Sequence, residues 1–379
     1  MYLYLMASWW QQSFFSNDSH PAHIRALDGI RGFAVLLVMM SHASLEGLNP
    51  APGIVLMAAG KGGVMLFFVL SAFLLDRQIV QALHQQKATR RYWANYVLRR
   101  VLRIYPLFAL ALVVHWFLDD SWHSPSIDSL SAVGQHLLLQ QGTGVFWSIP
   151  VEFKYYLISP VLLWGLHRIT NWKFPTTSRL LYLLLVLSIV VASVWPWSPI
   201  STLKYLPIFL VGTLFSILQY FQPDKLASRF SLPRQTYITV AVLLIAYLIL
   251  PHPMEHLFGV RVKAHNTVSY SLWALAGLWL VISVQYRKDV FRRIFQVRAL
   301  RWVGNISFSL YLFHMPVLYA VLNWEGLPSY LRLPTFLLGS FLLASISYLL
   351  VERPLSKVRL RKPSSESHIE ASPERFKEK

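Results

Sequence analysis

The sequence contains no cysteine among its 379 residues, and only 14% of its residues are charged. Without cysteine, the chain can form neither disulfide bonds nor zinc sites with thiolate ligands. Soluble domains carry charge at about 25% of positions, so the low content argues against an ordinary soluble enzyme. No cleavable signal peptide is expected, because residues 1–10 are apolar but lack a basic start and a small-residue cleavage site.

What the sequence has instead is apolar and basic. Hydrophobic residues make up 55% of the chain, aromatic residues 15%, and the net charge is +18. Such a charge could indicate nucleic-acid binding. The basic residues, however, occur in blocks between long apolar runs, as in the cytoplasmic loops of membrane proteins. We therefore expect the lipid bilayer as a partner and no nucleic acid.

Apolar runs that could cross a bilayer recur along the chain, since a crossing needs about 20 mainly apolar residues. The ten candidates are residues 27–47, 62–76, 101–118, 146–167, 180–195, 204–221, 237–250, 267–286, 303–323 and 333–351. Two of them, 62–76 and 237–250, are short and are expected to be thin, tilted or partly re-entrant. The sequence thus predicts an all-α polytopic membrane protein with about ten transmembrane helices.

The loop charges indicate how these spans are oriented. One side holds 29 of the 35 Lys and Arg residues and the other holds 5, with Lys154 inside a span. Because positive loops stay in the cytoplasm, both termini are predicted to be cytoplasmic in a multi-pass protein of the cytoplasmic (inner) membrane. The expected division is an N-terminal cytoplasmic or interfacial segment (1–26), a transmembrane domain (27–354) and a disordered basic tail (355–379).

The first predicted span carries two ionisable residues, Arg31 and His42, which are eleven positions apart. Eleven helical steps return to nearly the same face and separate the residues by about 16 Å. Arg31 alone could extend its charge to the membrane surface, and His42 alone could bond a neighbouring carbonyl. Together on one face, they favour a protein-lined functional site.

Other polar residues also lie in or beside spans. Arg100 and Arg103 share a helix face where a span meets the cytosol, which suits either topology-setting charge or a phosphate clamp. Glu152 lies about one turn inside a span, a depth that packing alone hardly explains. Glu352, at the end of the last span, is expected to be structural and could pair with a basic loop.

Late in the chain, Ser307, Tyr311 and His314 recur at spacings of four and three, which places them along one helical stripe. No metal site is predicted. His115 and Asp119 follow helical spacing, but two ligands are too few for a site.

Taken together and in this order, the motifs resemble membrane acyltransferase family 3, whose members O-acylate bacterial surface glycans. The similarity covers about residues 27–354. It rests on Arg31 and His42; on residues 63–71; on Arg100, Arg103, Tyr105 and Pro106; on Trp147, Ser148 and Glu152; and on Ser307, Ser309, Tyr311, His314 and Pro316. The chain departs from the family at Met65, often acidic, at Ala72, often glycine, and at Pro150, which interrupts the Trp–Glu segment.

The resemblance implies transfer of an acyl group, expected to be acetyl, from cytosolic acyl-CoA to a hydroxyl of a cell-surface or lipid-linked carbohydrate. Some relatives add an extracellular esterase-like domain, which is not expected in this chain. The implied residues are His42, Arg31 and Glu152 for catalysis; Arg100, Arg103 and Tyr105 for the donor; and Trp147, Ser148, Ser307, Tyr311 and His314 for the acceptor. His42 is expected to act as general base, with Glu152 or Tyr311 orienting its imidazole or binding the sugar.

Alternatives to this function and mechanism come from the same residues. Intramembrane Arg, His and Glu also suit an ion-coupled transporter of a small anionic or sugar-like solute. The sequence has no inverted repeat with paired broken helices, which argues against that alternative. A silent scaffold that binds lipid-linked glycans is a third interpretation. A covalent acyl-His42 relay is a less favoured mechanism.

Overall fold

The computed structural model describes residues 10–15, 23–51, 54–122, 127–232, 234–249, 251–259, 267–287 and 290–360. These residues form helices and connecting turns, and no strand occurs among them. The predicted all-α class is confirmed. The expectations for residues 1–9, 16–22 and 361–379 lie outside the described residues. Residues 355–360, assigned above to the tail, contact the start of α4, because Leu360 N donates to Asn95 Oδ1 at 2.9 Å.

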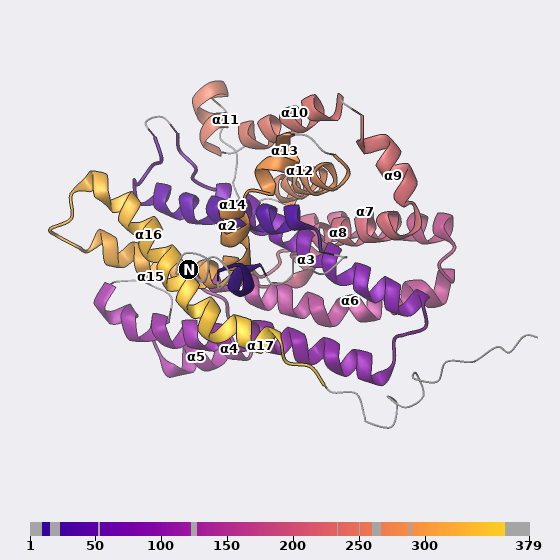
Figure 1. Cartoon of the computed structure of the whole chain (residues 1–379), viewed down its shortest axis with the longest axis horizontal. Helices are drawn as coiled ribbons and strands as arrows, with labels where there is room; N and C mark the ends of the chain where they lie inside the picture. The colour runs from indigo at the N-terminus through magenta and orange to yellow at the C-terminus, as the bar shows by residue number, and fades with distance from the viewer. Residues whose placement is uncertain are drawn as a thin grey trace, which may run out of the picture.

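Most of the described chain is helical (Figure 1). The helices are α2 (Arg25–Leu45), α3 (Ala59–His84), α4 (Arg90–Trp122), α5 (Leu130–Leu137), α6 (Ser148–Thr170), α7 (Phe174–Val194), α8 (Thr202–Phe221), α9 (Pro223–Phe230), α10 (Arg234–Leu248), α11 (Pro251–Phe258), α12 (Thr267–Tyr286), α13 (Val290–Phe295), α14 (Arg298–Asn305), α15 (Ser307–Leu322), α16 (Ser329–Ser347) and α17 (Arg353–Ser356). A 3-10 turn, Gly144–Trp147, precedes α6, and a π-helical turn, Tyr348–Glu352, joins α16 to α17.

Membrane-length helices are present, so the chain is a multi-pass membrane protein. Within the described ranges, six helices are long and apolar enough to cross a bilayer, and counting two bent helix pairs as spans raises this to eight. Ten spans and cytoplasmic termini stay predictions. The second span is longer than predicted, because α3 runs for 26 residues, whereas α10 is short, at 15 residues. Tilted or partly re-entrant placement of these two segments stays a prediction.

Exposed side chains show which helices face lipid. On α7, large apolar side chains such as Leu183, Val186 and Val190 are exposed, whereas α3 and α8 are mostly buried. Figure 1 shows α9, α10 and α11 along one edge of the molecule and α4 and α5 along the opposite edge, with α2, α3 and α8 between them. A continuous apolar surface of this kind is stable in a bilayer and not in water.

The predicted continuous span 303–323 is wrong, because the chain turns by 79° between α14 and α15. Close packing of α14 on α2 explains the turn. A Cβ on Gly304 would lie 1.8 Å from the carbonyl oxygen of Asp28, so only glycine permits this approach. The turn exposes the first backbone N–H groups of α15, and Glu352 caps them by accepting from Ser309 N at 3.1 Å and from the Ser309 hydroxyl.

The second contact that fixes α2 is with α3. A Cβ on Gly63 would lie 2.4 Å from the carbonyl oxygen of Ala34, so the two backbones touch. Small residues at helix contacts are the usual means of close approach in membranes, where apolar burial drives little association. α2 is therefore held between α3 and α14.

A buried carboxylate, Asp76, ties α3 to α6 and α8. It accepts hydrogen bonds from the hydroxyls of Tyr155 and Thr213, both at 2.6 Å, and from that of Ser159. Because Tyr155 and Ser159 lie on α6, Asp76 fixes the rotation of the helix that also carries Glu152. The sequence pattern marked Asp76 only as the end of a span.

We expect Asp76→Ala to lower the stability of the detergent-solubilised protein. Three hydrogen bonds at about 0.6 kcal/mol each in a membrane interior amount to roughly 2 kcal/mol. Thermal unfolding followed by circular dichroism should therefore move to lower temperature, and Asp76→Asn, which keeps an acceptor oxygen, should lose less. An Asp76→Ala protein as stable as the wild type would contradict this role.

Candidate active site

The candidate site is built on α2 and α15, which lie side by side. Arg31 Nη2 donates to Ser307 Oγ at 3.2 Å, and His42 Nδ1 lies 2.8 Å from His314 Nε2. Both pairs occur in the same order along the two helices, so α2 and α15 run in the same direction. The helical stripe predicted for α15 therefore follows the Arg31–His42 face of α2.

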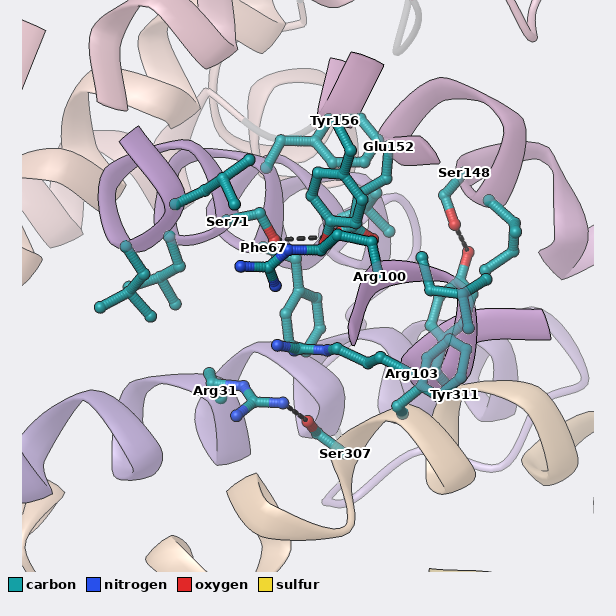
Figure 2. A pocket seen from close by; sticks show the side chains of 18 of the residues that line it. Arg31, Phe67, Ser71, Arg100, Arg103, Ser148, Glu152, Tyr156, Ser307 and Tyr311 are labelled. Carbon is teal, nitrogen blue, oxygen red and sulfur yellow. Dashed lines mark hydrogen bonds between the residues drawn. The ribbon is translucent and has the colours of Figure 1, made fainter. Parts of the chain in front are cut away.

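A cavity of about 190 Å³, here named the arginine cavity, opens beside the first of these pairs. Arg31 from α2 and both Arg100 and Arg103 from α4 line it. Figure 2 shows the three guanidinium groups one above another along the cavity. Three guanidinium groups around one space form a binding site for an anion with several oxygens, because each can donate two parallel hydrogen bonds.

The carboxylate of Glu152 also faces the arginine cavity, but hydroxyl groups rather than arginines hold it. It accepts from Ser71 Oγ and from the hydroxyl of Tyr156, both at 2.5 Å (Figure 2). Arg100 lies over the ring of Tyr156, 5.2 Å from its centroid. Across the described chain, Arg100 and Arg103 form no ion pair, so their donors stay available for a ligand.

Beside the second pair lies a larger cavity of about 530 Å³, here named the histidine cavity. Its wall includes His42, Lys61 and Trp147. Val64 and Tyr311 border both cavities. These two side chains therefore form part of a wall that both cavities share.

The hydrogen bonds of His314 determine which nitrogen of His42 can act as a base. His314 Nδ1 lies 3.0 Å from the carbonyl oxygens of both Leu310 and Tyr311, and a carbonyl can only accept. Nδ1 of neutral His314 therefore carries the proton, and its Nε2 accepts from Nδ1–H of neutral His42. This leaves Nε2 of His42 with a lone pair, the arrangement that a general base requires.

His314, rather than Glu152 or Tyr311, is the residue that orients His42. The hydroxyl of Tyr311 accepts from Ser148 Oγ at 2.8 Å and donates to Val145 O at 2.6 Å, which attaches α15 to the start of α6. The hydrogen bond between the two hydroxyls therefore holds Tyr311, a side chain that borders both cavities, against Ser148.

The remaining predicted residues fall in different places. Trp147 lines the histidine cavity, and Ser148 and Ser307 line the arginine cavity. Tyr105 lies in neither: its ring packs against Phe153, with centroids 5.0 Å apart. Its predicted contact with the donor stays a prediction.

Three residues of the site carried no role in the sequence interpretation: Ser71, Tyr156 and Lys61. Tyr156 is one helical turn after Glu152, so its spacing could have identified it. Pro150 does not displace Glu152, since it lies in the first turn of α6, where a proline removes no intrahelical hydrogen bond. Met65, the departure on α3, is a fully buried core residue.

No cluster that could hold a metal ion occurs in the part of the chain that the structure describes. His115, considered above with Asp119, has Nε2 3.1 Å from the carbonyl oxygen of Leu312 and packs against Phe146. Its contacts are those of a histidine that joins α4 to α15.

The two cavities, with their arginines and histidines, fit a membrane enzyme that handles an anionic substrate. A family model described as an acyltransferase domain, the third acyltransferase family, matches residues 24–352. The match covers well over half of the chain, which therefore belongs to this family of acyltransferases.

Curated relatives agree with this assignment. The chain is 23% identical to the O-acetyltransferase OatA of Staphylococcus aureus (strain NCTC 8325 / PS 47), over 89% of this chain and 58% of that protein. It is 19% identical to the peptidoglycan O-acetyltransferase OatA of Listeria monocytogenes and 25% identical to the putative peptidoglycan O-acetyltransferase YrhL of Bacillus subtilis, covering 56% of each. The chain thus spans somewhat more than half of these relatives. No solved structure matches it.

The hydrogen bond between the two histidines leads to a kinetic prediction. His314→Leu removes the acceptor for Nδ1–H of His42, so the imidazole loses its fixed orientation, and we expect kcat for acyl transfer to fall at least about tenfold. The KM for the acyl donor should change little. His314→Gln, whose Oε1 can accept the same hydrogen bond, should recover part of the loss. Equal activity of His314→Leu and the wild type would contradict the assigned role.

Proposed function

We propose that this protein is an integral membrane O-acyltransferase that moves an acetyl group from cytosolic acetyl-CoA to a hydroxyl of a cell-surface or lipid-linked carbohydrate. One observation carries the proposal: a cavity lined by three arginines shares two wall side chains, Val64 and Tyr311, with a cavity lined by His42. The relatives described above, an O-acetyltransferase and a peptidoglycan O-acetyltransferase, support the same reaction.

The arginine cavity suits the donor. Coenzyme A carries a diphosphate and a further phosphate, and guanidinium groups bind phosphate oxygens in pairs. Arg100 and Arg103 form no ion pair among the described residues, although Glu152 lines the same cavity, and Arg31 donates one hydrogen bond to Ser307. The thioester end of the donor would extend from these arginines past Tyr311 toward His42.

The histidine cavity suits the acceptor and the proton transfers. Nε2 of His42 takes the proton of the acceptor hydroxyl as its oxygen attacks the thioester carbonyl carbon. The carbon–sulfur bond then breaks, and the departing thiolate of coenzyme A takes a proton from the imidazolium. The products are an O-acyl sugar and free coenzyme A, and His42 returns to its neutral form.

Loop charge supports the direction of transfer. The strong excess of Lys and Arg on one side predicts that α2 begins at the cytoplasm, which puts Arg31 nearer the source of acetyl-CoA and His42 nearer the outside. Family membership favours this reaction over ion-coupled transport, the alternative function considered for the same intramembrane charges.

Removal of the proposed base is the direct test of acyl transfer. We expect His42→Ala to reduce transfer of radiolabelled acetyl from acetyl-CoA to the envelope glycan by at least about a hundredfold. His84→Ala is the matched control, because His84 lies at the exposed end of α3 and bonds Tyr220 instead. Near-normal transfer by His42→Ala at equal protein level would reject the proposed mechanism.

Binding of the donor has its own test. Arg103→Ala should weaken the binding of coenzyme A about ten- to a hundredfold, since a hydrogen bond to a charged group contributes about 1.5–3 kcal/mol. Titration calorimetry of the detergent-solubilised protein would measure it. Arg99→Ala is the control, because Arg99 bonds Asn95 O and does not line the cavity. Equal losses in both variants would reject a specific role for Arg103.

A further inference from the structure

One cation in the histidine cavity has no role in the mechanism above. Lys61, in the first turn of α3, lines this cavity together with His42, and its Nζ lies 4.0 Å from the centroid of the Trp147 ring. Lys61 is half-buried. Glu255 also borders the cavity, yet no ion pair joins it to Lys61 in the described part of the chain.

The surroundings of Lys61 add positive charge. Lys204, at the start of α8, lies near enough for its positive charge to act on Lys61. Lys204 itself lies over the ring of Tyr205, 5.8 Å from its centroid. With Lys61 and Lys204 against the single carboxylate of Glu255, these side chains sum to a net positive charge, which favours an anionic ligand.

Packing on Trp147 does not account for this lysine. A cation over an aromatic face contributes about 0.5–2 kcal/mol, and a charged side chain within a membrane helix costs about 2.5–3.5 kcal/mol at the centre and less toward its ends. The two terms come close to cancelling, so the contact leaves no net gain that would favour lysine over an uncharged side chain. A bound anion would add an interaction that an uncharged side chain at this position could not make.

The positions of Lys61 and His42 relate the anion to the reaction. α2 and α3 are in contact here, since a Cβ on Gly60 would lie 3.0 Å from Ser41 Cβ, so both side chains border one cavity. Trp147 and Tyr311 give this space aromatic walls on which a sugar ring can pack.

We propose that the acceptor is an acidic carbohydrate, and that its carboxylate or phosphate binds Lys61 while a hydroxyl reaches Nε2 of His42. Lys61 is then a residue that determines acceptor specificity. This inference rests on the proposed function, since it requires the histidine cavity to hold the acceptor.

The test uses the full-length protein in a host strain whose own copy is deleted, carrying the wild type, K61M, K61R or K173M. Lys173 is an exposed lysine before α7 that lines neither cavity, so K173M controls for the loss of one charge. The acylated sugar is first identified by mass spectrometry. KM and kcat are then measured for short fragments of that glycan in three forms: native, carboxyl-reduced and phosphatase-treated.

The proposal predicts an anionic group on the acylated sugar or its neighbour. K61M should raise the KM for the native fragment at least tenfold, whereas its KM for the fragment without the anion should stay close to the wild-type value. K61R and K173M should have KM values close to those of the wild type for every fragment. Loss of affinity on carboxyl reduction identifies a carboxylate, and loss on phosphatase treatment identifies a phosphate.

Three results would overturn the proposal. The acylated sugar and its neighbours could carry no anionic group, the wild-type KM could be the same with and without that group, or K61M could raise the KM equally for all three fragments. Thermal unfolding of K61M checks that the variant is folded. If it is not, the wild-type KM values for the native and the anion-free fragments still decide, because the proposal requires them to differ. Failure of the proposed function would give another result. The wild-type protein would then transfer no acyl group to any fragment, and H42A would not alter acylation of the glycan.

Discussion

The structure depends on the close, same-direction pairing of α2 and α15. Backbone contact of Gly63 with Ala34 and of Gly304 with Asp28 holds α2 between α3 and α14, and the turn after α14 then lays α15 along it. Only in this register can Arg31 reach Ser307 while His42 reaches His314. In a bilayer, where apolar burial drives little helix association, such glycine contacts and interhelical hydrogen bonds determine the arrangement.

Under the proposed function, this pairing would separate donor binding from proton transfer along a single axis. Guanidinium groups gather at one end, and an imidazole with a free Nε2 lies at the other. Tyr311, whose hydroxyl is fully occupied by Ser148 and Val145, borders both spaces. A membrane enzyme whose two substrates approach from opposite faces needs this geometry, because neither substrate can cross the bilayer to reach the other.

The length of the apolar runs was enough to predict the all-α class, and helical periodicity was enough to predict the shared face of Arg31 and His42 and the clustering of Arg100 with Arg103. Periodicity could not predict the features that depend on contacts between helices. Tyr105 is two residues beyond Arg103 and so points about 200° away from it. The break at Ile306 follows from packing against α2, and Glu352 became the cap of α15 rather than a partner for a loop. His314 could be placed on a stripe, but its contact with His42 joins residues 272 positions apart.

The absence of cysteine makes the central claim, that the two cavities open to opposite sides of the membrane, directly measurable. Single cysteines at Gln78, in the arginine cavity, and at Leu45, in the histidine cavity, can be labelled with a membrane-impermeant thiol reagent added to either face. The account predicts labelling of Q78C only from the cytoplasmic face, with protection by coenzyme A, and of L45C only from the outer face, without protection. Labelling of both positions from the same face would contradict it.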